Sequence, residues 1–145
     1  MPRSRTDIDT VYRVVQREFR RYHMPVVDLI EAQTRDPFKV LVSTILSART
    51  RDETTAEASK RLFTRVDTPA DLRRLPETEI DKLIFPVGFH RTKARALKAL
   101  PERLDELFGG RIPDTVEELI QLPAVGRKTA NLVVAVGFGK PAICV

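Results

Sequence analysis

Apolar residues recur at the spacing of an α-helix along most of the chain, with polar residues between them. The first stripe lies within residues 8–22, and arginines occupy the opposite face; its apolar members are Ile8, Val11, Val15, Phe19 and Tyr22. This pattern predicts an amphipathic helix that begins after Asp7.

A second apolar stretch, residues 37–46, is hydrophobic on nearly every side. Asp36 is a suitable N-cap, and Pro37 follows at the first helical position, where its missing N–H has no consequence. Because a helix that is apolar all round is buried, we expect this segment to be the central helix of the fold. After a polar loop, residues 53–63 predict the next helix.

Three short segments each begin with Pro or Thr and extend over one or two helical turns; they are residues 68–75, 76–84 and 113–121. The longest predicted helix spans residues 91–107 and turns four apolar residues inward, namely Ala94, Leu97, Leu100 and Leu104. No segment of the sequence alternates with the two-residue period of a strand. The sequence therefore predicts an all-α bundle, with an N-terminal amphipathic helix in residues 1–24 and a helical domain in residues 25–145.

The most informative stretch is Leu122–Ala130, in which a turn containing Pro123 ends at Gly126 and a helix begins. The first N–H groups of a helix have no partner inside it and, with the helix dipole, attract anions. Arg127 and Lys128 on the first turn oppose that dipole unless an anion such as a phosphate lies beside them. The alternative is that Gly126 is an ordinary turn residue and that both basic side chains are solvated.

The segment before this turn completes a helix–hairpin–helix pattern at about residues 113–136. Thr115 is placed as an N-cap, and Glu118, three residues later, completes the pattern of a capping box. Lys128 has the surroundings of a nucleophile, because a lysine attacks as its neutral amine and both the helix start and Arg127 favour that form. These conditions are typical of a lysine that forms a Schiff base.

Composition narrows the class of protein. The 145 residues are 42% hydrophobic and carry a formal charge of +5 with a pI near 9.7, which suits one domain with a polyanionic partner. The chain has no apolar run of membrane-spanning length and no signal-peptide pattern, so a cytoplasmic, nucleoid-associated protein is expected. With Cys144 as the only cysteine and only two histidines, His23 and His90, we expect neither a disulfide nor a metal site.

The segment Leu-Pro-Ala-Val-Gly-Arg-Lys-Thr-Ala at 122–130 resembles the helix–hairpin–helix of the endonuclease III family of DNA N-glycosylases. The resemblance implies that Lys128 is the catalytic nucleophile. It also implies DNA contacts from the hairpin residues Val125, Gly126, Arg127 and Thr129. Ala124 departs from the family pattern, because the family usually has glycine at this first hairpin position.

Two other segments, residues 37–52 and 87–94, resemble the family's central helix and its second DNA-facing loop. The family inserts side chains from these loops into the duplex to fill the gap left by the extruded nucleotide. The matching positions are Arg49 and Phe89, and both a guanidinium and a phenyl ring can stack on bases. Gly88, His90 and Lys93 are further expected DNA contacts. The alternatives are that Arg49 is a solvated loop residue and Phe89 a core residue.

The function implied by the resemblance is base-excision DNA repair. A bifunctional N-glycosylase removes a damaged base and then cleaves the strand by β-elimination, as an AP lyase. The expected partner is double-stranded DNA with a damaged base, an oxidised pyrimidine by family default, or an abasic site. No membrane partner is expected, and the full-length protein should be a monomer.

The sequence lacks two parts that the family pattern requires. No Asp or Glu follows Glu118, whereas the family's catalytic aspartate follows a segment that matches Gly139–Val145. The family's four cysteines for a [4Fe–4S] cluster are also missing, so no cofactor is expected in this chain. We therefore expect an N-terminal fragment with impaired catalysis, whose first helix would pack on a C-terminal region that is absent here.

Two alternatives to this assignment stay open. The chain could be a helix–hairpin–helix module that grips the DNA backbone without catalysis. A monofunctional mismatch glycosylase is the second alternative, although such relatives usually lack the lysine at 128.

Overall fold

The computed structural model describes residues 36–140, and every regular element within that range is helical. The predictions for residues 1–35, including the helix at 8–22, and for Cys144 lie outside the described residues. The elements are α3 (Pro37–Ser47), α4 (Asp52–Phe63), α5 (Pro69–Arg74), α6 (Glu77–Ile84), α7 (His90–Phe108), α8 (Val116–Leu119), α9 (Arg127–Leu132) and the π-helix η1 (Val133–Gly137). The all-α prediction is confirmed for this part of the chain.

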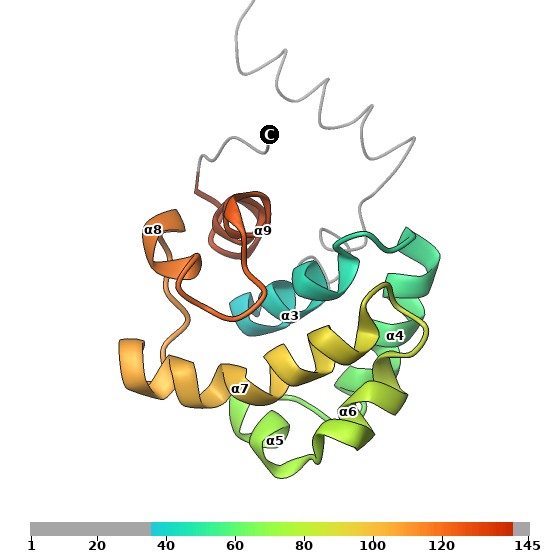
Figure 1. Ribbon diagram of the computed structural model, residues 1–145. Helices are drawn as coiled ribbons and strands as arrows, with labels where there is room; N and C mark the ends of the chain where they lie inside the picture. Colours follow the sequence, from blue (N-terminus) through green and yellow to red (C-terminus); the bar gives the residue numbers. More distant parts are fainter. Residues whose placement is uncertain (1–35, 141–145) are drawn as a thin grey trace, which may run out of the picture.

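Helix α3 is the buried centre of the described domain, as its apolar sequence predicted. The Asp36 carboxylate caps it by accepting the Phe38 N–H at 3.0 Å, and Pro37 occupies the first turn. The polar side chain of Thr44 is also buried, and its hydroxyl donates to the Val40 carbonyl at 2.6 Å. Helices α4, α7 and α9 and the π-helix η1 all pack on α3 (Figure 1).

Helix α7 is the longest of the described helices, and the shorter helices α5 and α6 pack on it. Its predicted inward residues Ala94, Leu97, Leu100 and Leu104 are buried. Pro101 lies inside the helix and is buried as well. The helix ends at Gly109, whose φ of 63° is the left-handed conformation that glycine adopts without strain. Among the described helices, none is both long and apolar enough to span a bilayer.

The predicted helix–hairpin–helix is present as α8, a turn, and α9. Thr115 caps α8 by accepting the Glu118 N–H at 3.3 Å, and its hydroxyl donates to the Glu118 carboxylate at 2.8 Å. The turn is anchored by two buried side chains, Leu122 and Val125. Helix α9 continues into η1, which packs on α3 and so fixes the hairpin to the central helix.

Ala124 takes a left-handed φ of 60° in the hairpin turn, the conformation that explains why glycine suits this position. We expect Ala124→Gly to raise the free energy of unfolding by up to about 1 kcal/mol, because glycine removes the Cβ clash. Denaturant unfolding measures the change. The same substitution at Ala99, inside α7, is the matched control and should lower stability by about 1 kcal/mol. A loss of stability in both variants would contradict the strain at Ala124.

Candidate nucleic-acid interface

The hairpin presents Lys128 on the protein surface. Lys128 is the second residue of α9, and Gly126, Arg127 and Lys128 are all exposed. Gly126 is the N-cap with an extended backbone, so α9 begins directly after it. The arrangement places two cations and the first N–H groups of a helix on one exposed turn.

Two residues of the hairpin that were predicted to contact DNA, Val125 and Thr129, lie in the interior of the protein. The side chains of Val125 and Thr129 are buried, and the Val125 N–H donates to the Leu122 carbonyl at 3.3 Å. Val125 therefore anchors the turn from below and has no exposed side chain to offer a ligand. Thr129 likewise faces the interior on the first turn of α9.

The two predicted wedge residues lie together on the surface. Arg49 follows α3 and Phe89 precedes α7, and the guanidinium carbon of Arg49 is 5.7 Å from the centre of the Phe89 ring. Both residues have left-handed backbones, with φ of 55° and 56°. Phe89 is 61% exposed, so the alternative that it is a core residue is wrong. Exposed aromatic and guanidinium groups stacked on each other can both stack on nucleic-acid bases.

The loops that carry these two residues touch through Gly88. Its N–H donates to the Thr50 hydroxyl at 2.9 Å. A Cβ atom at position 88 would lie 2.5 Å from the Arg49 carbonyl oxygen, so only glycine fits there. Gly88 was predicted as a DNA contact, and the structure adds a packing reason for this glycine: the two loops approach each other at this residue.

Lys93, which was predicted to contact DNA, is buried with 6% of its surface exposed. Its ammonium donates to the carbonyls of Leu46 at 2.9 Å and Ala48 at 2.5 Å and to the Thr50 hydroxyl at 3.2 Å. The structure therefore does not support a DNA contact by Lys93, because its ammonium is buried and bonded to three oxygens of the protein. Its spacing to the buried Leu97 could have revealed this position, since residues four apart share a helix face.

His90 begins α7 and faces the neighbouring helix α6. Its Nδ1 lies 2.5 Å from the Asp81 carboxylate, and its ring meets the edge of Phe85 with centroids 5.1 Å apart. This contact differs from the predicted DNA contact. Since the ring is only half-buried, the geometry leaves a DNA contact by His90 as a prediction.

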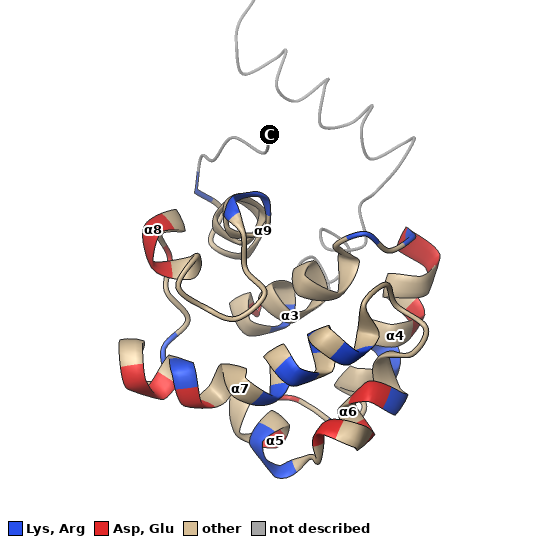
Figure 2. Cartoon of the chain, in the orientation of Figure 1, with Lys and Arg blue, Asp and Glu red and all other residues tan. Residues whose placement is uncertain are grey.

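Charge is distributed unevenly over the described helices. Figure 2 shows basic residues at the start of α9 and in the loop after α3, where the sequence has Arg127, Lys128, Arg49 and Arg51. Acidic residues occupy α8, the beginning of α4, α6 and the far end of α7. Helix α3 connects these two basic sites, because it packs on α9 and ends at the loop that carries Arg49. A polyanion would meet basic groups at both places.

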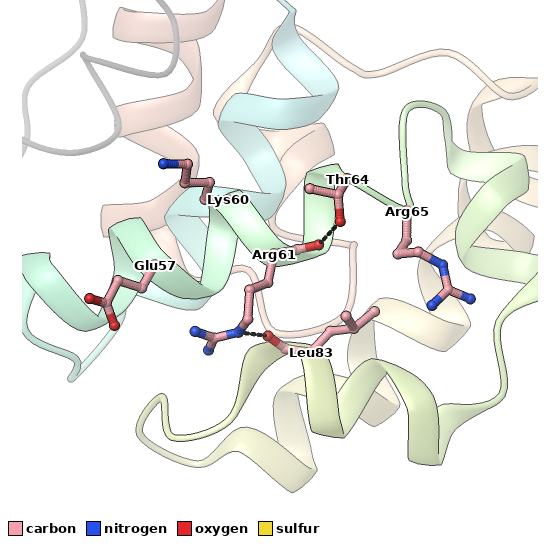
Figure 3. A pocket seen from close by; sticks show the side chains of 6 residues that line it. All are labelled: Glu57, Lys60, Arg61, Thr64, Arg65 and Leu83. Atoms are coloured by element: carbon pink, nitrogen blue, oxygen red, sulfur yellow. Dashed lines mark hydrogen bonds between the residues drawn. The ribbon is translucent and has the colours of Figure 1, made fainter.

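A hollow of about 500 Å³ lies between α4 and α6, away from the predicted residues (Figure 3). Figure 3 shows the Arg61 side chain extending from α4 toward α6, and its Nε donates to the Leu83 carbonyl at 3.0 Å. The same guanidinium donates to the Phe85 carbonyl at 2.5 Å. Arg61 thus ties α4 to the end of α6, where the Phe89 loop begins.

The residues of this chain do not fit an iron–sulfur cluster. Such a cluster needs several thiolate ligands, and the sequence has one cysteine. Among residues 36–140, no group of three or more His, Cys, Asp or Glu side chains is arranged to hold a metal ion.

Burial lowers the pKa of Lys93 from its usual 10.5 to about 8. Between these values the unfolded chain holds a proton that the folded protein releases, so the stability of the folded state should rise with pH over this window. The three surrounding oxygens favour the ammonium and reduce the gain. We expect the stability of the wild type relative to Lys93→Met to rise by about 1 to 3 kcal/mol from pH 8 to 10.5.

Denaturant unfolding of both proteins across this pH range measures the difference. Lys60→Met, which removes an exposed lysine of α4, is the control and should show no such rise. A relative stability that falls with pH would contradict the lowered pKa of Lys93, because it would mean that the folded protein holds the proton more tightly than the unfolded chain.

Comparison of the sequence with protein families matches residues 42–145 to the HhH-GPD superfamily of base excision DNA repair proteins. The chain is 44% identical to endonuclease III of Thermotoga maritima over 138 residues, which covers 95% of this chain and 61% of that protein. It is 40% identical to endonuclease III of Bacillus subtilis over 110 residues, covering 76% of this chain and 50% of that protein. The chain thus spans between half and about three fifths of these two relatives.

Solved structures agree with this relationship. A trapped endonuclease III–DNA covalent intermediate matches with a TM-score of 0.78 and 39% identity, covering 89% of this chain and 58% of that one. A thermostable thymine-DNA glycosylase matches with a TM-score of 0.71 and 30% identity, covering 83% and 53%. By sequence and by fold, the chain belongs to the HhH-GPD superfamily of base excision DNA repair proteins and, within it, to the endonuclease III-like family.

Proposed function

We propose that this protein is a DNA N-glycosylase with AP lyase activity and that Lys128 is its nucleophile. The observation that carries the proposal is the exposed position of Lys128 at the start of α9, directly after the hairpin. The fold around it matches endonuclease III–DNA complexes, one of them a trapped covalent intermediate. A covalent complex with DNA needs a protein nucleophile, and an exposed lysine amine can supply one.

The proposed substrate is double-stranded DNA with a damaged base, an oxidised pyrimidine by family expectation, or an abasic site. The damaged nucleotide leaves the base stack, and Arg49 and Phe89 fill the space that it vacates. The contact between these two side chains supports this role, because a stacked pair presents one continuous surface to the bases. We further propose that the protein acts as a monomer, since Lys128 and both loops belong to one chain.

The proposed chemistry has two stages. The Lys128 amine attacks the sugar C1′, the bond from C1′ to the base breaks, and the base leaves with the electron pair of that bond and takes up a proton. The attached nitrogen then loses a proton, and the C1′–O4′ bond breaks with its electron pair going to O4′, which takes up a proton. The sugar ring opens and C1′ becomes part of an iminium (Schiff base). The iminium acidifies the C2′ proton, whose removal expels the 3′ phosphate by β-elimination. A carboxylate near the sugar would stabilise the positive charge that develops there.

The second candidate function is a helix–hairpin–helix module that binds DNA without catalysis, and the exposed basic start of α9 supports it as well. The two functions differ at an abasic site, which has already lost its base. There the amine condenses with the free sugar aldehyde, and no departing base needs assistance. An abasic duplex therefore tests Lys128 independently of the carboxylate.

We expect borohydride to trap a covalent adduct between the 145-residue chain and an abasic duplex, and Lys128→Ala to abolish it. The affinity of Lys128→Ala for duplex DNA should differ from that of the wild type by less than about threefold, because the loss of one cation near the phosphates has a small effect at moderate salt. Gel analysis of the trapped adduct and a binding titration measure the two effects. Lys60→Ala, on the α4 surface, is the control and should trap like the wild type. Binding without any adduct in the wild type would favour the module.

Gly126 offers a second test of the hairpin. A Cβ atom there meets nothing within 4 Å, and its φ of −96° suits any residue, so Gly126→Ala should leave stability unchanged. If a phosphate approaches the backbone at this turn, the added methyl should weaken duplex binding by roughly three- to tenfold, the value of about one hydrogen bond.

Gly88→Ala contrasts with Gly126→Ala, because the alanine Cβ at position 88 would clash with the Arg49 carbonyl oxygen. It should lower the free energy of unfolding by about 1 to 3 kcal/mol. Fluorescence anisotropy with duplex DNA and denaturant unfolding distinguish the two variants. Unchanged affinity in Gly126→Ala would remove Gly126 from the interface.

A further inference from the structure

The Thr50 hydroxyl connects two loops that are far apart in the sequence. It accepts the Gly88 N–H at 2.9 Å and the Lys93 ammonium at 3.2 Å, and it lies 3.3 Å from the Ala48 carbonyl, to which it donates. A hydroxyl has one donor and two acceptor positions, so these contacts use its full capacity. One side-chain atom thus joins the α3–α4 loop to the α6–α7 loop.

Lys93 supports this junction from inside the protein. Its ammonium has three donors, and they meet three oxygens, on Leu46, Ala48 and Thr50. The carbonyls at the end of a helix lack partners within the helix and attract a cation. Lys93 therefore satisfies the end of α3 and holds Thr50 in place. A buried amine so engaged is not available to attack DNA.

The residues beside this junction have unfavourable backbones. Arg49 and Phe89 both have a positive φ, which costs each about 1 kcal/mol unless the surroundings impose it. Residues 48 and 50 flank Arg49 and are held by Lys93, and Gly88 precedes Phe89 and is held by Thr50. Arg61 fixes the other end of the Phe89 loop through the Leu83 and Phe85 carbonyls.

We propose that Thr50 and Lys93 form a clasp, with Gly88 as its contact, that holds Arg49 and Phe89 as a preassembled wedge before DNA binds. Thr50 and Lys93 are positioning residues, because they act on DNA only through the two side chains that they hold. Two separate loops would lose conformational freedom on binding, and a clasp made in the free protein removes that loss. The proposal rests on the wedge role of Arg49 and Phe89 given above.

The first experiment compares Thr50→Val with Thr50→Ser in the free chain. Valine keeps the branched shape and removes the hydroxyl, whereas serine keeps the hydroxyl. Hydrogen exchange of the Gly88 amide should be at least about tenfold faster in Thr50→Val and nearly unchanged in Thr50→Ser. Equal exchange in the two variants would overturn the clasp, whatever the DNA results.

The second experiment measures affinity for a duplex with a tetrahydrofuran abasic analogue and for the intact duplex. Thr50→Val should weaken binding to the abasic duplex by roughly three- to tenfold, with little effect on the intact duplex, and Thr50→Ser should bind like the wild type. Lys93→Met should behave like Thr50→Val, with Lys60→Met as the charge-matched control. If Lys93→Met fails to fold, the Thr50 pair still decides the result.

A double-mutant cycle separates the clasp from a general structural role. If Thr50 acts through the wedge, Thr50→Val should cause no further loss of abasic affinity in a Phe89→Ala background. Additive losses would overturn the proposal. Failure of the proposed function gives a different result: the wild type would show neither a trapped adduct nor a preference for the abasic duplex, while the Gly88 amide would still respond to Thr50→Val.

Discussion

A helix that is buried along almost its whole length must have both of its ends satisfied by groups of the protein. Helix α3 is such a helix, and the constraint explains much of what surrounds it. At its beginning, the Asp36 carboxylate accepts a backbone N–H. At its end, the Lys93 ammonium takes the Leu46 and Ala48 carbonyls. A cation on α7 thus lies where α3 ends, and its bond to the Thr50 hydroxyl links it to the loop that follows.

The same helix relates the two parts of the proposed interface. The hairpin helix α9 and its extension η1 pack on α3, and the Arg49 loop follows directly from its end. The buried helix α3 therefore connects the proposed nucleophile to the proposed wedge. The exposed groups, Lys128, Arg49 and Phe89, contribute little to the core, so the fold places them without depending on them.

Local sequence patterns predict several elements of this fold correctly. The central helix, its Asp36 cap, the inward face of α7 and the hairpin were predicted from local patterns, because caps and apolar spacing act within a few residues. Ala124 shows the same locality: the family pattern indicated a glycine position, and the structure has a left-handed backbone there. The wedge residues depended on family resemblance, since nothing in the spacing of Arg49 and Phe89 predicts their contact.

Lys93 and Thr50 show where that reasoning fails. A lysine in a basic segment beside a proposed DNA contact was assigned to the surface, although its helical spacing to Leu97 put it on the buried face. Thr50 was not singled out, because a threonine in a loop has no distinctive pattern. Its partners lie 38 and 43 residues away, and no local signal reports a hydrogen bond across that distance.

The sequence by itself determined most helices between residues 36 and 140, the Asp36 and Thr115 caps and the hairpin, and it supplied the proposal that Lys128 is the nucleophile. These depend on neighbouring residues and on a motif read along the chain. Only the tertiary structure decided that Lys93 is an internal cation, that Thr50 joins two loops, and that Arg49 lies against Phe89. The physical reason is that burial and satisfaction of polar groups depend on which helix ends meet in space. Helix α3 meets α7 through contacts that neither segment encodes alone.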